Sequence, residues 1–342
     1  MRMIIFSSQF PELYGGSRPK EYKRMARALE RMDIEPIHRF VTTLDRLIRD
    51  IEEYKPDLVF AAIDHTTDED GRQRISPLLE KMKIAYVGSN PDGLNNALSK
   101  VKAKEIWARY GIRTPRIFRL ESVSDIDDIP PESYPLILKP IIGGGSRGIT
   151  EDNVFYTGEQ LKRRLEELIS QSKSGLFAER YIHGREFTIS IMGNGKGKII
   201  APSELVPRKG SKPIVITHRM KEGTPGTRPI EPEPLHDKPL RDRLAEFAER
   251  MYDACSLRDY GRADVIMDDE GRLYAIEING QPVFESYYLT GFKGLGMDYE
   301  AVVAGVIYAS IRRWRSEGMD LPVPSSLKEI LPPEILRRLS RG

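Results

Sequence analysis

Residues 261–268 read GRADVIMD and residues 272–280 read RLYAIEING, and the three residues between them are Asp-Glu-Gly. Two such runs separated by a turn that contains glycine predict a β-hairpin. Side chains alternate along a strand, so Arg262 and Asp264 share one face of the first strand. In the second strand the same alternation predicts one face formed by Leu273, Ala275, Glu277 and Asn279.

Three side chains with oxygen donors are therefore expected to converge at one end of this hairpin: Asp264, Glu277 and Asn279. Hard oxygen ligands on a rigid scaffold suit Mg²⁺, especially Mg²⁺ that also contacts phosphate. The alternative is a solvated hairpin face that carries acids by chance. The hairpin alone does not separate these two interpretations.

The composition narrows the class of protein. A chain of 342 residues is longer than one core usually requires, which predicts two or three domains. A hydrophobic content of 39% excludes a disordered chain, and a net charge of +2 gives no reason to expect nucleic acid or membrane as a partner. The single cysteine, Cys255, excludes an internal disulfide. With no apolar run long enough for a bilayer and no signal-peptide pattern, we expect a cytoplasmic enzyme or binding protein.

Residues 1–92 alternate short apolar strands with amphipathic helices. Strands are predicted at 3–7 and 57–63, and this alternation is typical of an open, mostly parallel sheet. Ligands of such sheets bind off the carboxyl ends of the strands. The loops at 15–21 and 64–71 follow those ends, so this domain is expected to bind substrate.

A second domain is predicted over residues 93–176. It begins with one helix over 95–111 and contains the strand YPLILKP (134–140), which runs into the glycine-rich segment 143–148. Glycines let backbone N–H groups approach phosphate oxygens, and Lys139 at the strand end can neutralise them. The segment matches neither a P-loop nor the dinucleotide fingerprint, and an ordinary glycine turn is the alternative.

A third domain is predicted over residues 177–342. Its first strands carry Glu179 and Glu186, which belong either to a charged surface or to a nucleotide pocket. The segment 206–229 has many Gly and Pro residues and several basic ones, and it predicts a mobile loop that closes over phosphate.

Five stretches in this order resemble the ATP-grasp superfamily and, within it, the D-alanine–D-alanine ligases. They are DEDGRQRISPLLEKMKIAYVGS, ALSKVKAKEIWARYGIRTP, YPLILKPIIGGGSRGI, AERYIHGREFTISIMGN and GRADVIMDDEGRLYAIEIN. The resemblance covers residues 55–300 and, more loosely, the first 50. It implies a three-domain α/β architecture with an N-terminal parallel-sheet domain, and it favours the metal-site interpretation of the hairpin.

The resemblance implies a role for each matching residue. ATP would be held by Lys102, Lys139, Ser146, Gly148, Glu179, Arg180, Ile182, Glu186 and Arg219. Two Mg²⁺ ions, with Mn²⁺ as a substitute, would be bound by Asp264, Glu277 and Asn279. The reacting acyl centre would involve Arg262, Glu21, Gly145 and Ser146. The amino-acid substrates would meet His65, Val283, Ser286 and Tyr288.

The activity implied is ATP-dependent ligation of a carboxylate to an amine through an acylphosphate, with small amino-acid-like substrates and a homodimer left open. The substrate half departs from the family pattern: Gly145 and Tyr288 replace serines, Met220 replaces a tyrosine and Val283 replaces the oxyanion-hole glycine. These departures leave two alternatives. One is a related dipeptide or natural-product ligase that does not use D-alanine, and the other is a non-catalytic nucleotide-binding protein.

Overall fold

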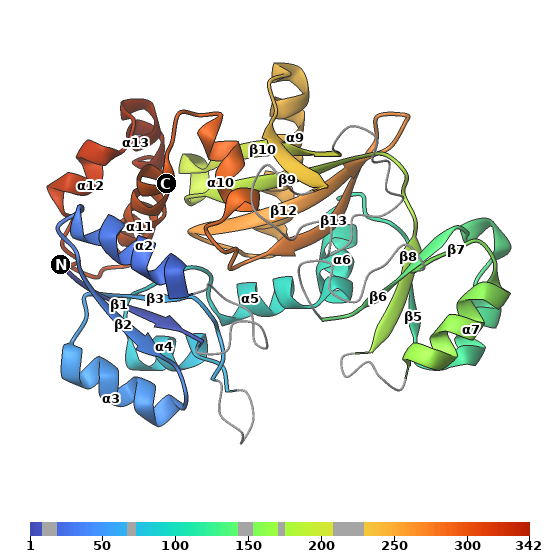
Figure 1. Cartoon of the computed structure of the whole chain (residues 1–342), viewed down its shortest axis with the longest axis horizontal. Helices are drawn as coiled ribbons and strands as arrows, with labels where there is room; N and C mark the ends of the chain where they lie inside the picture. Colours follow the sequence, from blue (N-terminus) through green and yellow to red (C-terminus); the bar gives the residue numbers. More distant parts are fainter. Residues whose placement is uncertain (9–18, 67–72, 143–152, 170–174, 208–228) are drawn as a thin grey trace.

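Three β-sheets organise the protein in the computed structural model, which describes residues 1–8, 19–66, 73–142, 153–169, 175–207 and 229–342. In Figure 1 the five-stranded sheet lies between the two four-stranded sheets. The mixed α/β class predicted from the sequence is confirmed. The boundaries predicted at residues 92 and 176 stay a prediction.

The N-terminal sheet has the strand order β2-β1-β3-β4, and all its strand pairs are parallel. This confirms the predicted parallel sheet. The strands are buried nearly throughout in β1 and β3, as expected for a sheet covered on both faces. Its elements are β1 (Arg2–Ser7), α2 (Pro19–Glu30), β2 (Glu35–Phe40), α3 (Leu44–Tyr54), β3 (Leu58–Ala61), α4 (Ser76–Met82) and β4 (Tyr86–Val87).

The second sheet is antiparallel, with the order β5-β8-β6-β7. One helix, α7, packs its buried residues Leu161 and Leu165 into the core of this sheet. The pairing sets Ile137 of β6 beside Glu179 of β8, which brings the end of β6 close to that carboxylate. The elements are β5 (Ile117–Leu120), β6 (Leu136–Pro140), β7 (Val154–Phe155), α7 (Gly158–Leu168) and β8 (Leu176–Arg180).

The third sheet has the antiparallel order β11-β10-β9-β12-β13. The predicted hairpin forms its last two strands, so β12 is an internal strand and β13 lies at the edge. Two helices, α9 and α10, pack against this sheet. The elements are β9 (Arg185–Met192), β10 (Ile199–Pro207), β11 (Ile230–Pro234), α9 (Lys238–Ala254), β12 (Tyr260–Met267), β13 (Leu273–Asn279) and α10 (Ser286–Lys293).

The last three helices return to the N-terminal sheet: α11 (Tyr299–Ser316), α12 (Ser325–Ile330) and α13 (Pro333–Leu339). Figure 1 shows α11 to α13, in red, beside the blue N-terminal elements. Residues of β1 and β3 belong to the same buried cluster as most of α11. Helix α11 is buried on nearly all sides, which explains why its sequence AVVAGVIYA has so little polar character. The two ends of the chain therefore share one core.

The predicted single helix over 95–111 is wrong, because the structure divides this segment into α5 (Pro91–Leu98) and α6 (Lys100–Arg109). Ser99 separates them in an extended conformation, and its side chain accepts a hydrogen bond from the backbone N–H of Lys102. A serine in this role is a helix N-cap. Ser99 also forms an isolated bridge with Ile142, so tertiary contact stabilises the break.

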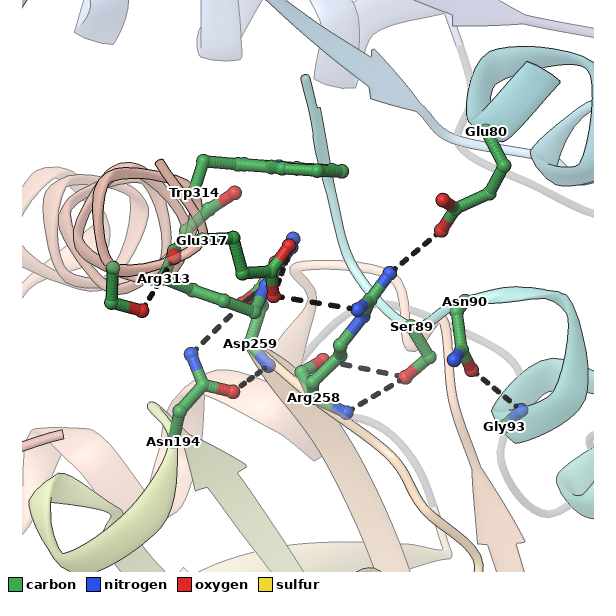
Figure 2. Close-up of polar contacts among 12 residues, drawn as sticks. Glu80, Ser89, Asn90, Gly93, Asn194, Arg258, Asp259, Arg313, Trp314 and Glu317 are labelled. Atoms are coloured by element: carbon green, nitrogen blue, oxygen red, sulfur yellow. Dashed lines mark hydrogen bonds and ion pairs between the residues drawn. The ribbon is translucent and has the colours of Figure 1, made fainter. Parts of the chain in front are cut away.

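A buried ion pair joins the N-terminal sheet to the third sheet (Figure 2). Asp259 is 0% exposed and accepts hydrogen bonds from Arg313 Nε and Nη2, each at 2.8 Å, from Asn194 Nδ2 at 2.9 Å and from Gly88 N at 2.8 Å. Arg313 also donates to the carbonyl of Tyr86 in β4. Burial opposes ionisation of Asp259, but Arg313 holds the pKa of its carboxyl below the usual value. This contact fixes the junction between the two sheets.

Among the described residues, no helix is both long and apolar enough to cross a membrane.

Candidate active site

The end of the hairpin carries the candidate site. Asp264 of β12 lies directly opposite Glu277 of β13, and Arg262 lies opposite Asn279. The side chains of Asp264 and Glu277 are 23% and 25% exposed, so both carboxylates are reachable from solvent. The predicted convergence of Asp264 and Glu277 is thus present as a directly paired position across two strands.

A β-bulge in β13 places Glu277 and Asn279 on the same face of the sheet as Arg262 and Asp264. The register pairs Asp264 with Glu277 but Val265 with Ala275, which leaves Ile276 as the extra residue. Leu273, Ala275 and Ile278 are buried, whereas Glu277 is partly exposed. The predicted common face of Leu273, Ala275, Glu277 and Asn279 is therefore wrong, because the bulge moves the last two residues to the opposite face.

Cationic side chains neutralise both carboxylates. Arg262 donates to Asp264 through Nε and Nη2, each at 3.1 Å, and Lys100 Nζ lies 3.3 Å from Glu277 Oε1. Thr188 on the neighbouring strand donates to Asp264 Oδ1 at 2.9 Å. Burial opposes the charge on Arg262, but Asp264 and Glu277 raise the pKa of its guanidinium. Each carboxylate therefore has a cationic side chain beside it, Arg262 at Asp264 and Lys100 at Glu277.

The donors at this site fit a hard divalent cation. Within the described part of the chain, no group of three or more His, Cys, Asp and Glu residues is arranged to hold a metal ion. A third ligand must then come from another oxygen, and the amide of Asn279 is such a donor, with its Oδ1 accepting a hydrogen bond from the N–H of Gln281 at 2.9 Å. Two carboxylates and an amide oxygen suit Mg²⁺ that completes its shell with water and phosphate.

A second cluster of charged side chains, Lys139, Glu179 and Lys104, lies at the end of β6. Lys139 Nζ donates to Glu179 Oε1 at 2.5 Å, and Lys104 Nζ lies 2.8 Å from Glu179 Oε2. Glu179 and Lys104 are almost fully buried, whereas the side chain of Lys139 is 12% exposed. Burial opposes the charge on Glu179, but the two lysines lower the pKa of its carboxyl. Glu179 is thus an ionised, buried bridge between two ammonium groups.

Lys102 is one of three lysines in α6, and its predicted contact with the nucleotide phosphates stays a prediction. Lys102 is exposed, whereas Lys100 and Lys104 are buried and reach Glu277 and Glu179. Residues four apart lie on the same face of a helix, and a residue midway between them lies on the other face. The sequence signal that could have identified Lys100 and Lys104 is Ser99, where the helix begins. A helix that begins there places these two lysines, four residues apart, on one face.

Some of the other predicted residues line the ends of β8 and β9. Arg180 is exposed at the end of β8, Ile182 is half-buried just beyond it, and Glu186 is half-buried near the start of β9, opposite Ile266 of β12. Their predicted contacts with a nucleotide stay predictions. Gly145, Ser146, Gly148 and Arg219, together with most of the predicted loop 206–229, lie outside the described residues.

The residues predicted for the substrate half come from separate elements. Glu21 is in the first turn of α2, and His65 forms an isolated bridge with Arg74 beyond β3. Val283 and Ser286 are half-buried before and at the start of α10. These four assignments stay predictions.

Tyr288 does not fit its predicted position beside a substrate. It is 0% exposed and packs against Tyr260, Phe284 and Phe292, and its hydroxyl donates to the carbonyl of Ile191 at 2.9 Å. An aromatic ring with a polar edge is stable in a core when that edge is hydrogen-bonded. Tyr288 therefore supports α10 against β9, and this prediction is corrected.

A cavity of about 300 Å³ lies elsewhere, between α9 and the segment that follows α6. Arg113, Arg243 and Arg250 contribute to its lining, together with Leu273 at the first position of β13. Glu277 and Asn279 are at the other end of that strand. This cavity is not part of the carboxylate site.

The fold, the paired carboxylates and the lysine-flanked glutamate together define a ligase of the ATP-grasp class. The chain belongs to the family described as "D-ala D-ala ligase C-terminus", whose model matches residues 123–308. This match covers β6 to β8 of the second sheet and all of the third sheet, so it includes Lys139, Glu179 and the hairpin carboxylates, whereas β5 and α6, with Lys100 and Lys104, precede it.

Curated relatives cover most of the chain. D-alanine–D-alanine ligase B of Pseudomonas putida is 28% identical over 270 residues, which are 78% of this chain and 80% of the relative. D-alanine–D-alanine ligase of Aquifex aeolicus is 28% identical over 257 residues, which are 75% of this chain and 83% of the relative.

Solved structures share the fold. D-alanine–D-alanine ligase from Bacillus anthracis complexed with ATP is 21% identical with a TM-score of 0.69, and the alignment covers 93% of this chain and all of that chain. VanG D-Ala:D-Ser ligase from Enterococcus faecalis is 18% identical with a TM-score of 0.66, with 90% and 99% covered.

Proposed function

We propose that the protein joins the carboxylate of one small amino acid to the amine of a second with hydrolysis of ATP, as its relatives named D-alanine–D-alanine ligases do. The observation that carries this proposal is the pairing of Asp264 with Glu277 across the hairpin, next to Arg262. The names of the relatives support D-alanine as the substrate, and neither the natural-product ligase nor the non-catalytic protein is favoured by them.

The reaction has two steps. An oxygen of the first carboxylate attacks the γ-phosphorus of ATP, the bond to the β-phosphate oxygen breaks, and an acylphosphate and ADP form. The amine of the second amino acid then attacks the acyl carbon, the C–O bond to phosphate breaks, and the nitrogen loses a proton. An amide, inorganic phosphate and a proton are the products.

The residues of this chain contribute charge and position. Asp264, Glu277 and Asn279 would hold Mg²⁺, which neutralises the phosphate oxygens when bound. Arg262 presents a guanidinium that its contacts with Asp264 orient, and a fixed guanidinium stabilises negative charge that develops on an acyl oxygen. Lys139 at the end of β6 would contact the phosphates of ATP. Catalysis by fixed charges of this kind requires little rearrangement during the reaction.

The test is release of phosphate and ADP by the purified protein with ATP, Mg²⁺ and a panel of amino acids that includes D-alanine and D-serine. We expect D-alanine to support turnover in the wild type. Glu277→Gln should abolish it, because the substitution removes one of the two negative charges that would hold Mg²⁺. Glu246→Gln, an exposed glutamate of α9, is the matched control and should remain active. Turnover in Glu277→Gln at the rate of the wild type would remove the metal assignment, and no amino-acid-dependent turnover in the wild type would refute the proposed ligation.

Two properties of the protein stay proposals as well. A cytoplasmic location and a homodimer are what the proposed reaction and the family resemblance favour. Analytical ultracentrifugation tests the second.

A further inference from the structure

Lys104 is a buried lysine that the proposed reaction does not use. Its side chain is 1% exposed, and its ammonium lies 2.8 Å from Glu179 Oε2, 3.2 Å from Thr114 Oγ1 and 3.4 Å from the carbonyl of Ala275. These partners belong to β8 of the second sheet, to the segment before β5, and to β13 of the third sheet. Lys104 thus contacts both sheets whose residues carry the candidate site.

Glu179 has more cationic neighbours than one ion pair requires. Glu179 is one buried anion between two cations, Lys104 on one oxygen and Lys139 on the other. Desolvation lowers the pKa of Lys104 against the effect of Glu179, whereas Glu179 raises the pKa of Lys139 against desolvation. An ionised carboxylate that is buried this deeply requires at least one cation in contact with it.

Because Glu179 needs a counter-ion, the presence of Lys104 affects what Lys139 can bind. If Lys139 were the only partner of Glu179, moving its ammonium to a phosphate oxygen would leave a buried carboxylate without a counter-ion. With Lys104 in place, Glu179 remains neutralised, and the charge of Lys139 is available to an anionic substrate. Lys100 cannot substitute for Lys104, because its ammonium lies beside Glu277.

We propose that Lys104 is a positioning residue that neutralises Glu179 and so leaves Lys139 free to bind the phosphates of ATP. This inference rests on the proposed function only in taking ATP as the ligand of Lys139. It assigns to Lys104 no contact with ATP and no part in the chemistry.

The test is a double-mutant cycle on binding of ATP with Mg²⁺, measured by calorimetry without any amino acid. Lys104→Met should weaken ATP binding by about tenfold or more, because Lys139 then remains paired with Glu179. The double variant Lys104→Met/Glu179→Gln removes both the cation and the anion. It should bind ATP within about threefold of Glu179→Gln alone, because Lys104 acts only through that carboxylate, which both variants lack.

Two further variants separate positioning from general stability. Lys104→Arg keeps the charge and should retain tighter ATP binding than Lys104→Met. Lys198→Met removes another buried lysine, 5% exposed and paired with Asp253 and Glu249, and should lower the melting temperature without weakening ATP binding. In steady-state kinetics, Lys104→Met should raise the KM for ATP more than it lowers kcat.

The outcomes are distinct. If Lys104→Met binds ATP like the wild type, or if the folded double variant and Glu179→Gln differ by more than about threefold in ATP binding, the positioning role is wrong. If Lys104→Met does not fold, the double variant is the test, because its buried pair is neutral. It is compared with Glu179→Gln, and a difference of more than about threefold in ATP binding between these two variants refutes the role. If the wild type binds ATP but turns over no amino acid, the ligation proposal fails while this inference stands. If the wild type binds no ATP, both fail.

Discussion

Replacing Arg313 by methionine will leave the carboxylate of Asp259 without a counter-ion at the junction of the N-terminal and third sheets (Figure 2). Arg313 supplies two of the four hydrogen bonds that the carboxylate of Asp259 accepts, and Gly88 and Asn194 supply the others. The carbonyl of Tyr86 also loses Arg313 but keeps the indole N–H of Trp314 at 2.7 Å. The cost therefore comes mainly from the buried charge on Asp259.

The size of this cost follows from the burial. Removing one partner of a buried ion pair typically lowers the free energy of unfolding by about 3–5 kcal/mol. For 342 residues, an unfolding entropy of about 2.1 cal/mol/K per residue gives ~0.7 kcal/mol/K, so the melting temperature should fall by about 4–7 °C if the chain unfolds as one unit. Arg258→Met is the control, because its ion pairs with Glu80 and Glu317 are partly exposed and worth about 1 kcal/mol or less.

A neutral partner should recover most of the loss. Asp259→Asn together with Arg313→Met removes both charges of this buried pair, and asparagine tolerates the positive φ of 67° at position 259. The double variant should be destabilised by only about 1–2 kcal/mol. Thermal and urea unfolding of the three variants measures this. A double variant as unstable as Arg313→Met alone would show that packing, and not the unpaired charge, causes the loss.

The pH dependence supplies an independent check with a definite sign. In the wild type the pKa of Asp259 is held low, so its stabilising effect is present above the pKa of the unfolded chain and is lost as pH falls through the folded value. In Arg313→Met, burial acts without Arg313 and raises the pKa of Asp259 above the unfolded value. Stability is then lost as pH rises through that folded value. The difference between wild type and variant should be largest near neutral pH and should shrink on acidification, and a difference independent of pH would refute the reasoning.

Two further predictions concern the N-terminal sheet and α10. Burial and then Arg39 lower the pKa of His38, so the unfolded chain binds the proton more readily, and stability should fall as pH drops below about 6.5. His38→Gln should flatten this dependence in urea unfolding at pH 7.5 and 5.5, and an unchanged slope would count against His38 as its source. Gly291→Ala would place a methyl carbon 2.1 Å from the carbonyl oxygen of Ala201, so α10 must shift from β10. We expect a loss of about 1–3 kcal/mol or more in the free energy of unfolding, and wild-type stability would show that the contact relaxes freely.

Local pattern alone predicted several elements correctly. The hairpin of β12 and β13 and the parallel N-terminal sheet each have a periodicity and turn chemistry that act over a few neighbouring residues. The turn also sets the register next to it, which pairs Met267 with Leu273, Ile266 with Tyr274 and Val265 with Ala275. These features depend on short-range geometry, so the sequence carries them directly.

Other features of the structure could be predicted only by knowing which distant segments of the chain pack together. The bulge at Ile276 moves Glu277 and Asn279 to the site face, and it arises where β13 pairs with β12. Alternation along one strand contains no sign of an extra residue. The break at Ser99 had a local signal, a serine that can cap a helix, but the bridge to Ile142 comes from a distant part of the chain.

The amino-acid sequence by itself thus determined the hairpin, the parallel N-terminal sheet and the resemblance to the ATP-grasp ligases. Only the tertiary structure decided that Lys104 and Lys139 share Glu179, that Arg313 neutralises Asp259, and that Tyr288 lies in the core. The physical reason is burial. A charged or aromatic side chain gains its partners and loses water only when segments distant in sequence close around it, and no local pattern records which segments those are.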